Sequence, residues 1–135
     1  MNSDSPDSKE QQSITFTELD LGQSFADQIA SATGPCTLLD ILVVPHGTQD
    51  TAVEQWRLHS QHMKNRPGFI SAQLHRTPSR DGRVLVNLAV WESPAALLEA
   101  VTDPEFAKIA GDYPDGTVCT RQLVRPEAVA GICVA

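Results

Sequence analysis

A chain of 135 residues falls within the usual size of one domain, so a single hydrophobic core is expected. Hydrophobic residues make up 41% of it and charged residues 20%, a balance that excludes a wholly disordered chain. The formal net charge is −7 and the ten Lys and Arg residues are scattered, which excludes a basic surface for nucleic acid.

Residues 1–12 are rich in Ser, Asp and Gln and contain no apolar anchor, which predicts a disordered leader. A signal peptide would be basic and then apolar at this place. No run elsewhere approaches the roughly 18 apolar residues that a membrane-spanning helix needs. We therefore expect a cytoplasmic protein with no membrane partner.

Residues 13–35 are predicted to form an N-terminal extension that carries one short helix. Ser24 is a suitable N-cap for this helix, and Gly34-Pro35 gives it a sharp stop. We interpret the extension as a lid or brace added to the domain of residues 36–125.

The domain is expected to begin with a strand over residues 36–44, apolar on both faces except at Asp40. After a Pro-His-Gly turn, Thr48 or Asp50 is expected to cap a helix that extends to about Asn65. One face of that helix carries, at helical spacing, Val53, Trp56, Ser60 and Met63.

Residues 69–76 and 83–91 are predicted to form a hairpin of two strands, because turn residues separate two alternating segments. Successive side chains of a strand point to opposite faces of its sheet. In the second strand, one face carries Arg83, Leu85, Asn87, Ala89 and Trp91, and the other carries Val84, Val86, Leu88 and Val90. Both faces are mostly apolar.

Two short helices are expected within residues 94–110. Ser93-Pro94 and Asp103-Pro104 each place a cap residue before a Pro at the first helical position. A last strand follows over about residues 118–124, and residues 126–135 form an apolar but irregular tail.

This β-α-β-β-α-β order predicts an α+β, ferredoxin-like domain with a four-stranded antiparallel sheet and its helices on one face. The helices can cover only one face, so the face formed by Val and Leu needs a second cover. A second copy packed sheet to sheet would supply it, and we predict a homodimer. The alternative is a monomer in which the N-terminal helix or the tail covers that face.

Asn87 and Trp91 lie four residues apart in a predicted strand, so they share a face with Arg83. If the other face meets a partner, this face is the one that the helices cover. The amide and the indole would then line a cleft. The alternative is that Trp91 is a core aromatic residue and Asn87 satisfies a backbone group.

The histidines give a weaker signal. His59 and His62 could in principle hold a metal, but no carboxylate or Cys follows them at ligand spacing, so no metal site is predicted. His59 borders the Trp56 face, and His75 lies in a predicted strand. We take both as candidate pocket residues, with the alternative that His75 is an ordinary surface residue.

Cys36, Cys119 and Cys133 are far apart and form no Cys-x-x-Cys pair, so reduced, buried thiols are expected. No glycine-rich dinucleotide or nucleotide loop and no Gly-x-Ser-x-Gly elbow occurs. The chain therefore gives no sign of a bound cofactor.

Several segments, taken in order, resemble the antibiotic biosynthesis monooxygenase domain family, whose fold is the dimeric α+β barrel. The resemblance extends from Thr37 to about Val124. It rests on Val44-Pro45-His46-Gly47, Trp56 with Met63, Arg66-Pro67-Gly68-Phe69-Ile70-Ser71-Ala72, Leu74-His75-Arg76, Val86-Asn87-Leu88-Ala89-Val90-Trp91-Glu92-Ser93 and Pro104-Glu105-Phe106.

The family includes cofactor-independent anthrone oxygenases of aromatic polyketide pathways, quinol monooxygenases and haem-degrading enzymes, and relatives of the same fold are polyketide cyclases. In the anthrone oxygenases an Asn and a Trp of the third strand are implicated in catalysis, and Asn87 and Trp91 match them. The haem-degrading members carry a ligating His where this chain has Val101 or a neighbour. The resemblance therefore implies oxygenase chemistry and disfavours haem degradation.

Asp40 departs from the family, which often has an Asn at what we judge to be this position. A carboxylate can act as a base where an amide can only hydrogen-bond, so the resemblance makes Asp40 a candidate catalytic residue. The alternative is a buried carboxylate paired with Arg83 or Arg121, because a lone buried charge is costly.

We therefore predict a monooxygenase that needs no metal or cofactor and oxidises an anthrone- or quinol-like aromatic polyketide intermediate with dioxygen. Its expected catalytic residues are Asn87, Trp91 and Asp40, and its expected substrate-binding residues are Trp56, His59, Met63, His75 and Arg83. One alternative is a cyclase or isomerase of the same fold, in which Asp40 and a His direct an aldol closure. The other is a non-catalytic accessory protein that binds a small molecule.

Overall fold

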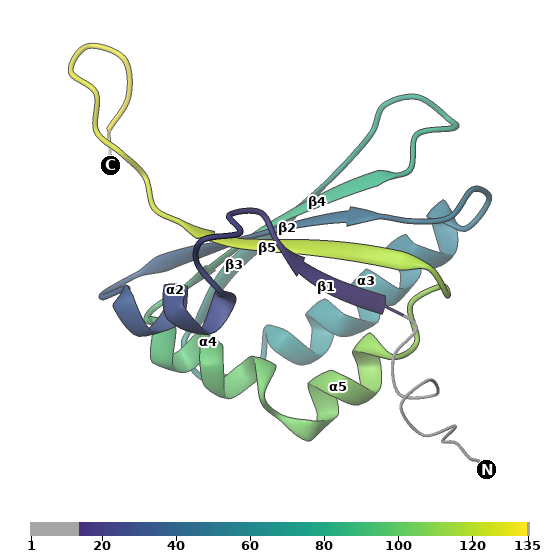
Figure 1. Cartoon of the computed structure of the whole chain (residues 1–135), viewed down its shortest axis with the longest axis horizontal. Coiled ribbons are helices and arrows are strands. Elements are labelled where there is room, and N and C mark those ends of the chain that lie inside the picture. The colour runs from purple at the N-terminus through teal and green to yellow at the C-terminus, as the bar shows by residue number, and fades with distance from the viewer. Residues whose placement is uncertain (1–13, 135) are drawn as a thin grey trace.

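The computed structural model describes residues 14–134, so the leader predicted for residues 1–12 lies outside the described residues. Figure 1 shows one sheet with helices packed against it. The described elements, in chain order, are β1 (Ile14–Glu18), α2 (Phe25–Ser31), β2 (Cys36–Val43), α3 (Gln49–Met63), β3 (Phe69–Arg76), β4 (Val84–Trp91), α4 (Pro94–Val101), α5 (Pro104–Ala110) and β5 (Thr117–Val124).

The sheet has five strands in the order β1-β5-β2-β4-β3. Strands β5-β2-β4-β3 form the predicted antiparallel ferredoxin-like arrangement. The prediction of a four-stranded antiparallel sheet is wrong in one respect, because β1 adds a fifth strand that pairs parallel to β5. Ile14 and Phe16 alternate with polar residues in β1, and their side chains continue the inner face of the sheet.

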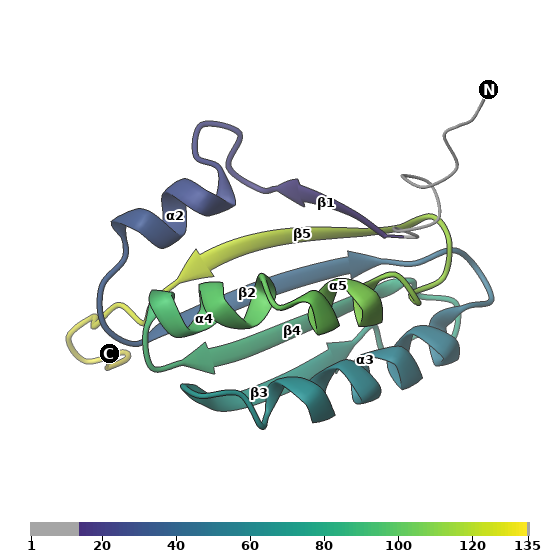
Figure 2. The same ribbon diagram turned by 90° about the horizontal axis from the view of Figure 1, so that it is seen from below.

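Helices α3, α4 and α5 lie on one face of the sheet, as Figure 2 shows. The predicted alternation of β4 is confirmed, because Leu85, Asn87, Ala89 and Trp91 are buried while the residues between them are partly or fully exposed. Leu97 of α4 is completely buried and belongs to this core. The inner face of β4 therefore looks towards the helical layer.

The predicted helix starts of α2, α4 and α5 are confirmed by their caps. The side chains of Ser24, Ser93 and Asp103 each accept a hydrogen bond from a backbone N–H in the first turn. The start of α3 differs: Thr48 occupies the N-cap, but its hydroxyl donates to the carbonyl of Pro45 and caps no helix N–H. This contact fixes the turn between β2 and α3.

Gly68 sets the approach of β3 to α4, and its substitution should be destabilising. Its φ is +87°, and a Cβ at this position would lie 2.4 Å from the Cβ of Ala96. We expect Gly68→Ala to lower the free energy of unfolding by about 2 kcal/mol or more, from the strained backbone and the clash together. Urea denaturation measures the change.

Gly131→Ala is the matched control, since Gly131 has a similar φ of +78° and open space around it. Its effect should be confined to about 1 kcal/mol from the backbone alone. Equal effects of the two substitutions would show that the Ala96 contact does not limit position 68.

The outer face of the sheet carries no helix of the described chain. On β4 it presents Val86, Leu88 and Val90, which are half-buried, and Val84, which is exposed. Residues 126–134 project from the body (Figure 1) and leave Val129, Ile132 and Val134 exposed. No helix of the described residues is long and apolar enough to cross a membrane.

Candidate active site

A cavity lies between the inner face of the sheet and the helical layer. Both tryptophans of the chain, Trp56 from α3 and Trp91 from β4, line it. Most of the remaining lining is apolar or aromatic: Ile14, Phe16, Leu38, Leu42, Met63, Phe69, Ala72, Ala89, Leu97, Val101, Phe106, Ala110 and Tyr113. Flat side chains of this kind favour a flat, apolar ligand.

A row of three polar residues crosses the sheet beneath this cavity. Asp40 of β2 pairs in register with Asn87 of β4 on one side and with Arg121 of β5 on the other. Directly paired residues of neighbouring strands project from the same face, so all three side chains line the cavity. The strand register therefore places a carboxylate between an amide and a guanidinium.

Asp40 is buried and keeps only two close polar partners among the described residues. The amide Nδ2 of Asn87 donates to Oδ2 of Asp40 at 3.2 Å, and Sγ of Cys119 lies 3.7 Å from Oδ1. Burial raises the pKa of Asp40 to about 6, against the opposing effects of Asn87, Arg121 and Cys119. The carboxyl group therefore titrates close to neutral pH, where a general base works best.

Two polar groups of the predicted catalytic residues are left without a protein partner. The indole Nε1 of Trp91 and the amide Oδ1 of Asn87 are buried and make no hydrogen bond to the described residues. Phe69 packs edge-on against Trp91, with ring centroids 5.4 Å apart, and holds the indole in place. A buried donor with a fixed direction and no acceptor is suited to bind an oxygen atom of a ligand.

His59 faces the cavity from α3 and is held among aromatic rings. Its Nδ1 lies 3.3 Å from the hydroxyl of Tyr113, and its ring packs edge-on against Phe106 at 5.1 Å. Burial, together with the charge of His62, lowers the pKa of His59 to about 4. At neutral pH the ring is uncharged, so it can exchange hydrogen bonds without adding a cation to the pocket.

This lowered pKa is a testable property of His59. We expect its ring to stay neutral down to about pH 5, which an NMR titration of the imidazole signals measures directly. His59 should therefore contribute stability that is present above its unfolded pKa of 6.5 and is lost as the pH falls towards 4. A midpoint near 6.5 in the folded protein would contradict the burial of this ring.

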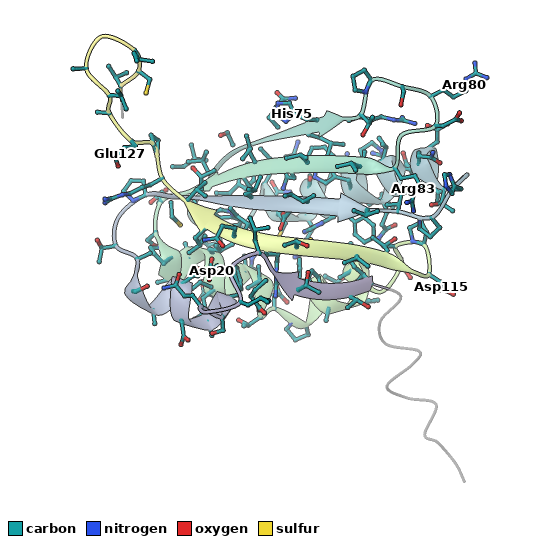
Figure 3. All side chains as sticks on the ribbon, turned by 45° about the horizontal axis from the view of Figure 1, so that its top comes forward. Asp20, His75, Arg80, Arg83, Asp115 and Glu127 are labelled. Carbon is teal, nitrogen blue, oxygen red and sulfur yellow. The ribbon has the colours of Figure 1, made fainter. Side chains whose placement is uncertain are left out.

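The structure brings together six of the eight residues predicted for the site. Asn87, Trp91 and Asp40 share the cavity with Trp56, His59 and Met63. His75 and Arg83, labelled in Figure 3, are not among the residues that line it. Arg83 lies just before β4 and donates to the carbonyl of Val44 at 3.3 Å. Its assignment to the substrate pocket is therefore corrected.

His75 is exposed and lies on the other face of the sheet, paired with Val86. The cause is a register shift between Phe69 and Ser71, since one extra residue in a strand moves every later side chain to the opposite face. Ala72 and Leu74 consequently face inwards, and His75 lies outside the cavity, as in the alternative of an ordinary surface residue.

Arg121 and Cys119 of β5 enter the site, although neither was predicted as a site residue. Arg121 makes no salt bridge with Asp40. The predicted alternative, a buried carboxylate paired with an arginine, is therefore present only as an attraction between the charges of two residues that pair in register.

The cysteines and the possible metal ligands give no further site residue beyond Cys119. Cys36 and Cys119 are buried as expected, but Cys133 is exposed. Within residues 14–134, no group of three His, Cys, Asp or Glu residues could hold a metal ion.

Fold and site together define a ferredoxin-like α+β domain with a buried cavity suited to a flat small molecule. The model of the antibiotic biosynthesis monooxygenase family matches residues 42–111, more than half of the chain. The chain belongs to this family. Asn87 and Trp91 lie within the matched residues, whereas Asp40 and Arg121 lie outside them. No curated protein sequence is significantly similar to the chain.

Solved structures agree with this assignment. A candidate monooxygenase from Shewanella loihica PV-4 is 27% identical, with a TM-score of 0.60, over 73% of this chain and 100% of the other. SnoaB, a cofactor-independent oxygenase from Streptomyces nogalater, is 21% identical, with a TM-score of 0.65, over 73% of this chain and 98% of its own. The second likeness shows the fold alone. The family and the first of these structures support an oxygenase or small-molecule-binding role.

Proposed function

We propose that the protein is a cofactor-independent monooxygenase that oxidises an anthrone- or quinol-like aromatic polyketide intermediate with dioxygen. The observation that carries this proposal is the buried indole Nε1 of Trp91, which has no acceptor among the described residues and lies in the same aromatic cavity as Asp40 and Asn87. SnoaB, which shares the fold, is described as a cofactor-independent oxygenase.

The first proposed step is removal of a proton from the substrate by Asp40. With a pKa of about 6, this carboxyl group is ionised at pH 7 to 8 and yet basic enough to accept a proton from an acidic C–H or O–H. The product is an electron-rich enolate or phenolate. Trp91 Nε1–H and the Asn87 amide are the donors proposed to stabilise its oxygen.

The second proposed step is electron transfer from this anion to dioxygen, because the electron-rich ring can itself act as the reductant. For an anthrone, the CH₂ carbon becomes a carbonyl: one oxygen atom enters the product, and the other leaves as water with the two hydrogens of that carbon. The substrate supplies all the electrons, so the balance needs no further reductant. The apolar lining would exclude water from the peroxide formed on the way.

A homodimer remains part of the proposal, supported by the uncovered apolar outer face of β4. We expect the protein to run as a dimer in light-scattering chromatography and Leu88→Glu, at the centre of that face, to be monomeric. The control is Leu98→Glu, which replaces an exposed leucine on α4. A monomeric native protein, or dimers of both variants, would contradict sheet-to-sheet pairing.

Oxygen uptake tests the proposed reaction. Purified protein, treated with a chelator to remove adventitious metal, is given a panel of anthrones and quinols in an oxygen electrode cell. Uptake above the rate of spontaneous autoxidation is the expected result. Absence of uptake, together with ring closure of a poly-β-ketone, would favour the cyclase, for which Asp40 in place of an amide is the specific indication. Absence of both reactions would favour a binding protein.

A further inference from the structure

Arg121 is the one permanent cation among the described residues that line the cavity. It forms no salt bridge with any described carboxylate, and its Nε is buried without a hydrogen-bond partner. Arg121 is half-buried, but its buried Nε–H is unfavourable as long as it has no acceptor. The proposed chemistry of Asp40, Asn87 and Trp91 does not use this cation.

The N-terminal extension holds the Arg121 guanidinium in place. The guanidinium carbon lies 4.2 Å from the ring centroids of both Phe16 and Phe25. These rings stabilise the cation through their π faces and offer it no acceptor. The Nε–H of the guanidinium is left without an acceptor, and Asp40 and Glu18 act on Arg121 through their charges without a salt bridge.

Two structural features bring these rings to Arg121. β1 pairs parallel to β5 (Figure 2), with Phe16 opposite Cys119, and both side chains line the cavity on the inner face of the sheet. Phe25 begins α2, and Oε1 of Gln28 in this helix accepts a hydrogen bond from the backbone N–H of Leu123 at 2.8 Å. β1 and α2 are thus both fastened to the strand that carries Arg121.

We infer that Arg121, held by Phe16 and Phe25, binds an anionic oxygen, either a carboxylate or an ionised hydroxyl, on the flat aromatic ligand of this cavity. The planar fork of an arginine matches the two oxygens of a carboxylate, and the surrounding aromatic wall accepts the ring. Phe16 and Phe25 precede residue 42, where the family match begins. The anion site is thus completed by the chain's own extension.

This inference concerns the same cavity as the proposed function but requires no reaction with oxygen, so binding alone tests it. The probes are 2-naphthoate and its neutral isostere 2-naphthamide, titrated by calorimetry at pH 7.5 into the native protein. A third probe, 1,4-dihydroxynaphthalene titrated in the absence of oxygen, reports whether an ionisable hydroxyl can replace the carboxylate. We expect naphthoate to bind at least tenfold more tightly than naphthamide, the range of a charge-assisted hydrogen bond.

Four variants test whether Arg121 causes that preference. Arg121→Gln should abolish it, whereas Arg125→Gln, the same change at an exposed arginine just after β5, should leave it intact. Phe16→Leu removes one ring beside the guanidinium and should reduce the preference severalfold. Asp40→Asn removes the neighbouring negative charge and should tighten naphthoate binding.

Arg121→Gln distinguishes a ligand-binding arginine from one that only balances the charge of Asp40. If Arg121 served Asp40 alone, the native protein would show no preference for naphthoate, and Arg121→Gln would change neither affinity. That result, a preference that survives Arg121→Gln, or no naphthoate binding at millimolar concentration would overturn the inference. Anion preference in a protein that takes up no oxygen would instead sustain the inference and refute the oxygenase.

Discussion

Asn87→Ala is expected to lower the rate of oxygen uptake by about two to three orders of magnitude, the usual effect of removing one donor to a developing oxyanion. The amide both hydrogen-bonds Asp40 at 3.2 Å and lines the cavity, so its loss destabilises the ionised form of Asp40 and removes a donor to the substrate anion. Trp91→Phe keeps a ring but removes the indole donor, and should act in the same direction. Initial rates at saturating substrate measure both effects.

Asn65→Ala is the matched control for Asn87→Ala, because Asn65 carries the same amide at an exposed position just after α3, outside the cavity. Its rate should equal that of the native protein. Circular dichroism and chromatography check that each variant keeps its fold and oligomeric state. Native rates for both Asn87→Ala and Trp91→Phe would exclude these residues from the mechanism.

Asp40→Asn is expected to make the protein more stable at neutral pH while making it a poorer catalyst. Burial raises the pKa of Asp40 from 3.8 to about 6, so the fold favours the protonated carboxyl group. The stability contributed by this group is complete below pH 3.8 and is lost as the pH rises through 6. An asparagine has no charge to desolvate, so the variant keeps its stability as the pH rises.

The expected gain in the free energy of unfolding is up to about 3 kcal/mol at pH 7, at roughly 1.4 kcal/mol for each pKa unit. It should vanish near pH 4, where the native carboxyl group is itself protonated. Comparing the variant with the native protein at each pH cancels the opposite contribution of His59. Urea denaturation from pH 4 to 8 measures the difference, and a constant offset across that range would contradict a raised pKa.

The same variant should lose at least a hundredfold in oxygen uptake, because an amide cannot accept the substrate proton. Stability and activity would then change in opposite directions at one residue, as expected of a buried charge that is kept for its function. Unchanged uptake would remove Asp40 from the proposed role of base. The proton would then have to leave the substrate by another route.

Local sequence signals predicted most of the fold correctly. Ser24, Ser93 and Asp103 cap helices where expected, since capping depends on a few neighbouring residues. The alternation in β4 correctly placed Asn87 and Trp91 on the covered face. Strand β1 was missed because it is short and its pairing with β5 joins residues about a hundred positions apart, which no local turn announces.

The site residues that were misjudged also depend on contacts and strand pairing that local sequence does not reveal. His75 could not be decided between pocket and surface, because the register shift after Phe69 that puts it on the outer face gives no signal in the residue order. Arg121 was considered only as a partner for Asp40, since its contacts with Phe16 and Phe25 depend on where the extension docks. Residues that share a face within one strand, such as Asn87 and Trp91, could be predicted from their spacing. The row of Asn87, Asp40 and Arg121 across β4, β2 and β5 could not, because it depends on how the three strands pair.

Oxidation of an aromatic substrate by dioxygen, in the cavity around Asn87, Trp91 and Asp40, is the reaction proposed for this chain. Incubation of the chelator-treated protein and an anthrone with ¹⁸O₂, followed by mass spectrometry of the product, is the direct test. We expect one labelled oxygen atom in each product molecule, formed at a rate that falls at least a hundredfold in Asn87→Ala. Label incorporation at the same rate in both proteins, or none above the protein-free control, would contradict it.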